Sequence, residues 1–102
     1  MPKYLFTDND DWEIGFEAMH DPGYRTLIWP DSGESNGDFG GGTLQVLTNI
    51  DGVIAAIPDS KVTAASVDGA EDQLQQLVFV SGGSVIVRLS GATNPNLQVA
   101  IK

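Results

Sequence analysis

One serine of this chain lies in a pattern that can form a catalytic nucleophile. Residues 33–37 read Gly-Glu-Ser-Asn-Gly, which matches the G-x-S-x-G sequence of a nucleophile elbow. That elbow needs a strand, a sharp turn and a helix in an α/β sheet, with a histidine further along the chain. Here no helical pattern follows Ser35, and the single histidine, His20, precedes it. We therefore interpret the match as part of a Gly/Ser loop and do not expect an enzyme.

The densest group of potential metal ligands is acidic. Asp8, Asp10 and Asp11 offer carboxylate oxygens of the kind that calcium binds. An EF-hand loop that began at Asp8 would need glycine at its sixth position and glutamate at its twelfth, but these positions hold Glu13 and Met19. A solvated turn is favoured over a calcium site of another kind. With no cysteine in the chain, disulfides and Cys-ligated metals are excluded, and no cofactor is expected.

The aromatic residues have two interpretations. Trp12, Tyr24 and Trp29, with Phe39, could form a flat platform on which a sugar stacks. In a small β-sandwich such side chains are more often part of the core, because each removes a large apolar area from water. Core packing is the favoured interpretation, and a ligand platform of Trp12, Tyr24 and Trp29 is the alternative.

The charge of the chain is concentrated near its start. Fourteen acidic and five basic residues give a formal net charge of −9 at pH 7. Residues 1–38 hold nine of the acids against Lys3 and Arg25, a net of −7. This balance argues against a nucleic-acid partner, since phosphate contacts need clustered Lys and Arg. No apolar run approaches the length of a membrane span. The acids serve either solubility or docking to a basic partner.

Alternating apolar residues and frequent turn residues predict short strands throughout the chain. A chain of 102 residues fits one domain. We expect an all-β fold, an antiparallel β-sandwich or jelly-roll-like barrel of about eight or nine short strands. Residues 1–23 are expected to form an acidic N-terminal arm or edge strands, and residues 24–102 the sandwich domain. The expected strands are residues 3–7, 12–18, 24–29, 43–48, 53–57, 61–67, 74–80, 84–90 and 97–102.

Several segments between these strands are expected to be irregular. Asn49 to Gly52 predicts a hairpin loop in which Gly52 supplies the positive φ. Turns are expected at residues 8–11 and 58–60, and residues 30–42 form the longest irregular stretch. Residues 68–76 could form a short helix, but a loop that runs into a strand is favoured, because so short a helix is marginal.

Residues 39–101, roughly 60% of the chain, carry turn motifs in a fixed order. In that order the motifs resemble those of the small β-sandwich virion proteins of tailed bacteriophages. This family often has a Trp after the Asp-Gly turn, where the present chain has Val53. The motifs are FGGGT at 39–43, DG at 51–52, AIP at 56–58, TAA at 63–65 and VRLSGATNP at 87–95.

The resemblance implies a structural protein of the virion. The expected function is that of a capsid decoration (cement) protein, a homotrimer that binds the major capsid protein on the exterior of the phage head after assembly in the host cytoplasm. A carbohydrate- or receptor-binding module of a tail or fibre is the alternative. We expect residues 1–20 and the loop 30–42 to make the contacts, because they hold most of the acidic charge and irregular backbone. The named candidates are Tyr4, Phe6, Trp12, Asp31, Glu34 and Asp38.

Overall fold

In a computed structural model, the chain is built almost wholly of β-strands, which confirms the predicted all-β sandwich. The structure describes residues 2–15, 23–30, 35–64, 75–81 and 83–102. These residues contain nine strands and no α-helix. The strands are β1 (Lys3–Phe6), β2 (Asp10–Ile14), β3 (Gly23–Trp29), β4 (Gly37–Asp38), β5 (Thr43–Ile50), β6 (Val53–Val62), β7 (Gln75–Ser81), β8 (Ser84–Ser90) and β9 (Asn96–Ile101).

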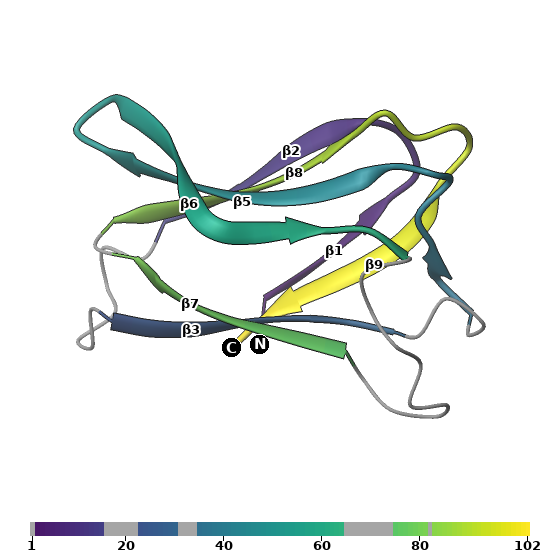
Figure 1. Cartoon of the computed structure of the whole chain (residues 1–102), viewed down its shortest axis with the longest axis horizontal. Helices are drawn as coiled ribbons and strands as arrows, with labels where there is room; N and C mark the ends of the chain where they lie inside the picture. The colour runs from purple at the N-terminus through teal and green to yellow at the C-terminus, as the bar shows by residue number, and fades with distance from the viewer. Residues whose placement is uncertain (1, 16–22, 31–34, 65–74, 82) are drawn as a thin grey trace.

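The strands form two antiparallel sheets packed face to face (Figure 1). Sheet A has the order β1-β9-β3-β7, with the short β4 beside β9, and sheet B has the order β2-β8-β5-β6. Apart from β4, the pairs are nested: β1 with β9, β2 with β8, β3 with β7, and β5 with β6. Nested pairing of eight strands in two sheets is the topology of a jelly roll. It brings the chain ends together, and Ile101 N donates to Pro2 O at 3.0 Å.

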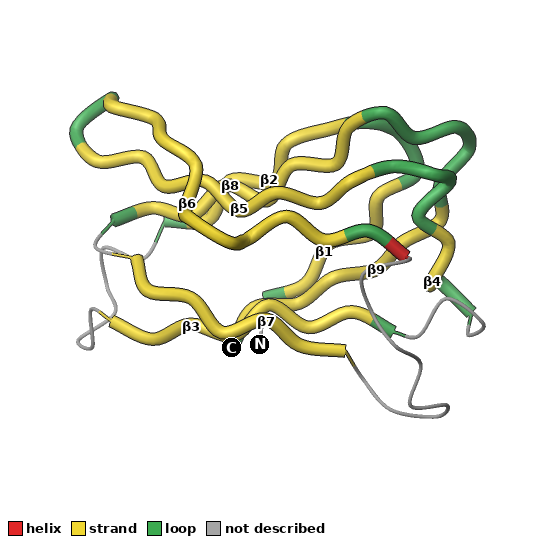
Figure 2. Tube along the Cα trace, viewed as in Figure 1, coloured by secondary structure: helices red, strands yellow, loops and turns green. Residues whose placement is uncertain are grey.

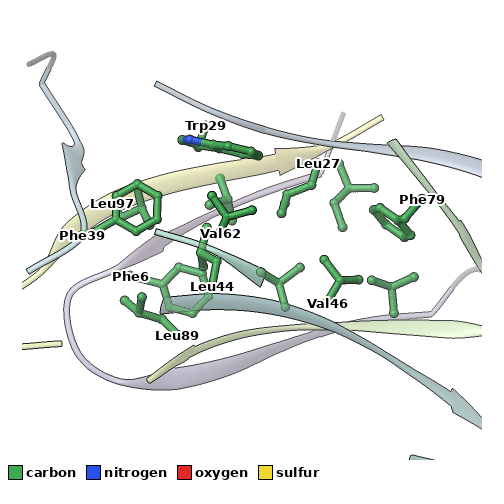
Figure 3. Packing of buried hydrophobic residues seen from close by; sticks show 14 residues of the cluster. Phe6, Leu27, Trp29, Phe39, Leu44, Val46, Val62, Phe79, Leu89 and Leu97 are labelled. Carbon is green, nitrogen blue, oxygen red and sulfur yellow. The ribbon is translucent and has the colours of Figure 1, made fainter. Parts of the chain in front are cut away.

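Alternation along each strand directs one set of side chains between the two sheets (Figure 3). On β9, for example, Leu97, Val99 and Ile101 are buried, while Gln98 and Ala100 face outward. Since the chain has no cysteine, burial of this apolar layer is the main stabilising term. The core cluster consists of Phe6, Leu27, Trp29, Phe39, Leu44, Val46, Val62, Phe79, Val85, Val87, Leu89, Leu97, Val99 and Ile101.

The predicted hairpin at residues 49–52 is confirmed and connects β5 to β6. Asp51 and Gly52 have φ values of 52° and 86°. Two central residues with positive φ are typical of the type I′ turn, which suits the twist of paired strands. Asn49 Oδ1 accepts a hydrogen bond of 3.0 Å from Gly52 N and supports this turn. The hairpin extends beyond the rest of the sandwich, at the upper left of Figure 2.

The expected turn at residues 58–60 is wrong, because β6 continues through Pro58 as far as Val62. The register between β5 and β6 shifts at this point, and Asp59 has a φ of 57°, so the strand forms a bulge. The buried Ser60 hydroxyl lies 3.0 Å from Val46 O and 2.6 Å from Ile57 O and can donate to one of them. Pro58 is tolerated because β6 is an edge strand with a bulge, where a missing N–H costs little.

Most other strands lie close to their predicted ranges. β8 spans residues 84–90 as expected, and β3 begins one residue before its expected start. β2 begins at Asp10, inside the segment expected to turn, because Asp10 and Asp11 pair with Leu89 and Arg88 of β8. The expected strand residues 16–18 and 65–67, and the helix-or-loop alternative up to residue 74, lie outside the described residues.

The turn that enters β5 packs against the turn that leaves β8. Thr93 N donates to Gly40 O at 2.9 Å, and Asp38 Oδ1 accepts from Gly40 N at 2.8 Å. The side chain of Asn9, between β1 and β2, accepts from Ala92 N at 2.8 Å and donates to Ala92 O at 3.0 Å. Three connections are thus tied together at one end of the sandwich. A Cβ atom at Gly40 would lie 2.5 Å from Thr93 O, so this position requires glycine.

Replacement of Gly40 tests this junction. We expect Gly40→Ala to lower the free energy of unfolding by about 3 kcal/mol, because it adds a backbone clash to an unfavourable positive φ. The matched control is Gly41→Ala, where φ is 75° but no atom lies within 4 Å of the added Cβ. The control should cost only about 1 kcal/mol. Urea denaturation measures both, and equal losses would contradict the steric role of Gly40.

Candidate functional site

The edge of the sandwich formed by β1 and β2 carries several of the residues expected to make contacts. Tyr4 lies edge-on to Phe6 with ring centroids 4.9 Å apart. It also stacks on Trp12 at 5.7 Å with an interplanar angle of 15°. Tyr4 pairs with Val99 and Trp12 with Val87, so both rings are on the inward side of their strands. The stack therefore closes this edge between the two sheets and leaves both rings half-buried.

Carboxylates surround this closed edge. The Tyr4 hydroxyl donates to Asp10, a hydrogen bond that raises the pKa of Tyr4 above its ordinary value. Arg88 Nε donates to Asp11 Oδ1 at 2.8 Å, and its Nη2 donates to Oδ2 at 3.0 Å. This two-point contact lowers the pKa of the Asp11 carboxyl and raises that of Arg88. Glu13 is also exposed on β2. The β1–β2 edge is thus an acidic surface, and its one cation, among the described residues, is held by Asp11.

The other expected contact residues have different surroundings. Phe6 is fully buried in the core, so its side chain packs inside the sandwich. Asp38, on β4, is exposed, and its carboxylate accepts a hydrogen bond from Gly40 N. Asp31 and Glu34 lie outside the described residues. The structure therefore brings Tyr4 and Trp12 together and places Asp38 near the turn at Gly40.

The three residues of the alternative ligand platform do not share one surface. Tyr24 is 80% exposed on the outer face of sheet A, while Trp29 is 4% exposed and faces the core. They lie at opposite ends of β3, about 17 Å apart at the usual rise of a strand. Trp12 belongs to the β1–β2 edge. Trp29 does line a hollow of about 350 Å³ with Ile28 and Pro30, to which Tyr24 and Trp12 do not contribute.

The residues considered for catalysis and metal binding do not converge in the described part of the chain. Ser35 is exposed in a turn beside Asn36, whose φ is 62°, and β4 rather than a helix follows it. His20 lies outside the described residues. Asp10 and Asp11 contact Tyr4 and Arg88, and no group of three acidic or histidine side chains suited to a metal occurs among the residues described.

The tip of the β5–β6 hairpin is an apolar surface that sequence reasoning did not identify as a candidate site. Ile50, Val53 and Ile54 are exposed by 48%, 69% and 53%. Sequence reasoning identified the hairpin but treated its strands as buried, because apolar residues on both faces are typical of central strands. The projection of the hairpin beyond the sandwich leaves these side chains in solvent (Figure 1). Exposed apolar patches of this kind often mark interaction sites.

Comparisons with known proteins place no name on this fold. No protein-family model matches the chain, and neither a curated protein nor a solved structure is similar to it. The described residues also include no helix long and apolar enough to cross a membrane.

The Asp11–Arg88 ion pair predicts a pH effect. Because the folded-state pKa of Asp11 is lowered, its contribution to stability is present above the ordinary value of about 3.9 and is lost as the pH falls through the lowered value. Both side chains are more than 40% exposed (43% and 45%), so this contribution should stay under about 1 kcal/mol. Arg88→Gln should raise the pKa of Asp11 in an NMR titration of its carboxyl carbon.

The control for that titration is Lys61→Gln. It removes an equal charge from the opposite edge strand of sheet B, three strands and about 14 Å from Asp11 in the paired register. The pKa of Asp11 should not change in this variant. An unchanged pKa in Arg88→Gln would show that the ion pair does not form in solution.

Proposed function

We propose that this protein is a capsid decoration protein of a tailed bacteriophage, which binds the exterior of the head and stabilises it. The observation that carries the proposal is the projecting β5–β6 hairpin with its exposed apolar tip, Ile50, Val53 and Ile54. Such a tip suits insertion between the subunits of a larger surface, where burial of apolar area stabilises both partners. The resemblance of the motifs in residues 39–101 to small virion β-sandwiches gives the partner, the major capsid protein.

Two surfaces of sheet B support the idea of a clamp. Along β8, Asn49 at the hairpin is opposite Ser84, while Asp10 of the acidic edge is opposite Leu89. The apolar tip and the start of the acidic edge are therefore near opposite ends of the sheet, in a domain with a longest dimension of 36 Å. One copy contacts one capsid subunit through the tip and a neighbouring basic subunit surface through the acids. Linking neighbours in this way resists their separation.

The remaining parts of the proposal come from the resemblance. The protein acts as a homotrimer and needs no cofactor or catalytic group. It joins the head during assembly in the host cytoplasm and remains on the virion. A carbohydrate- or receptor-binding module of a tail is the alternative function. Saturable binding to a glycan array together with no binding to heads would favour this alternative.

The double variant Val53→Asp/Ile54→Asp tests the apolar tip. We expect it to weaken binding to purified heads that lack the protein by at least about tenfold, as for loss of an anchor at the centre of an interface. It should also abolish the protein's stabilising effect on heated heads. Cosedimentation and differential scanning calorimetry measure the two effects. The domain itself should unfold within about 0.5 kcal/mol of the wild type, because both positions are exposed.

A matched control is Leu5→Asp, which places a carboxylate at a 42% exposed apolar position on sheet A. It should bind heads as the wild type does. Equal binding by the control and the hairpin variant would exclude the tip as a capsid contact, and no binding by the wild type would reject the decoration function.

The acidic edge predicts a salt effect on binding. The isosteric pair Asp8→Asn/Glu13→Gln removes two exposed carboxylates while leaving the contacts of Asp10 and Asp11 intact. We expect weaker binding to heads at low salt and a smaller loss of affinity as salt rises, because fewer charges are screened. Deletion of residues 1–20 is unsuitable here, since it also removes β1, β2 and the buried Phe6. An unchanged salt dependence would assign the acids to solubility alone.

A further inference from the structure

The outer edge of β7 is open in the described part of the chain. β7 pairs with β3 on one side, and no described strand pairs with its other side. The strand reads Gln-Gln-Leu-Val-Phe-Val-Ser and contains no charged residue, proline or glycine. An edge strand of this length and composition offers free N–H and C=O groups together with apolar side chains. It is therefore a template for another strand.

The other three edges carry features that oppose strand addition. β1 has four residues, one of them Lys3. β2 carries three acids, Asp10, Asp11 and Glu13. β6 contains Pro58, Lys61 and a bulge. Short length, charge, proline and bulges are the means by which natural sheets prevent edge pairing. Since three edges are protected and β7 is not, its exposure calls for a partner.

The outer face beside this edge is apolar and free of acidic residues. Val78 and Val80 of β7 are 57% and 56% exposed, and the adjacent Tyr24 of β3 is 80% exposed. The alternation of the described strands β1, β9, β3 and β7 gives the outward positions of sheet A as Lys3, Leu5, Gln98, Ala100, Tyr24, Thr26, Ile28, Gln76, Val78 and Val80. None of these is acidic, although the chain carries a net charge of −9.

This charge distribution selects the occupant of the edge. Two copies that met through the β1–β2 edge would bring acids together, and like charges directly opposite each other are destabilising. At β7 two copies meet through uncharged side chains, with the acids of the described β1–β2 edge on the far side of the sandwich. Strand addition also needs only backbone groups and fitting side chains, both of which a second β7 supplies.

We propose that β7 is the edge at which a second copy of this chain adds, by antiparallel strand pairing that continues sheet A from one copy into the next. About a twofold axis Val78 lies opposite Val78 and Leu77 opposite Phe79, so the pairing is self-complementary. In a threefold ring the same edge meets a different surface of the neighbouring copy. The proposal thus specifies the surface, and the measured mass gives the number of copies. It is independent of capsid binding.

The test uses the full chain without heads. Light scattering over a roughly hundredfold dilution measures the molar mass, which we expect to be a multiple of the 10.8 kDa monomer. Hydrogen exchange then follows the backbone amides of residues 75–81, which should exchange more slowly in the oligomer than after dilution to the monomer. Val78→Lys adds a charge of the kind that protects natural edges at an exposed position. It should raise the dissociation constant at least about tenfold.

The control is Leu5→Lys, which makes the same change of charge at an exposed apolar position on β1, the opposite edge of sheet A. It should leave the molar mass unchanged, and circular dichroism should show that both variants are folded. A wild type that is monomeric at every concentration overturns the proposal. So does an oligomer that Val78→Lys does not weaken, or one that both variants weaken equally.

Discussion

The backbone contact between Gly40 and Thr93 is the constraint on which the arrangement of the two sheets depends. It ties the turn into β5 to the turn out of β8, and Asn9 adds the β1–β2 connection through Ala92. A chain with no cysteine has no covalent link to hold these crossings. The contact also gives a physical reason why the FGGGT and SGAT motifs occur together: they are two halves of one junction. Neither half reaches its geometry without the other.

With the inward faces of both sheets buried, contacts with other molecules must come from edges, turns and outer faces. These surfaces differ in chemistry. The β1–β2 edge is closed by the Tyr4–Trp12 stack and surrounded by carboxylates. The β5–β6 hairpin exposes an apolar tip. The β7 edge is uncharged and open in the described part of the chain. A domain with three such surfaces can bind several neighbours at once, as a protein within an ordered shell must.

The strands whose side chains alternate in polarity could be predicted closely, and those shaped by their neighbours could not. β8 matched its expected range because its buried valines alternate with more polar residues. β6 did not, because the hydroxyl of Ser60, 15 residues from Gln45, supports a bulge that lets the strand pass Pro58. Among the candidate contacts, Phe6 and Trp29 had no local signal that distinguishes a core ring from a surface ring. That distinction depends on which strand lies opposite.

The sequence by itself determined the all-β class, the hairpin at Asp51-Gly52, the acidic start and the lack of disulfides, because these follow from local periodicity, turn chemistry and composition. Only the tertiary structure decided which strands form edges and where the hairpin ends relative to the sandwich. The exposure of Ile54 and Val78 and the burial of Phe6 and Trp29 follow from those two outcomes. The physical reason is that strand order is set by pairing between residues far apart in the chain, and no local pattern records it.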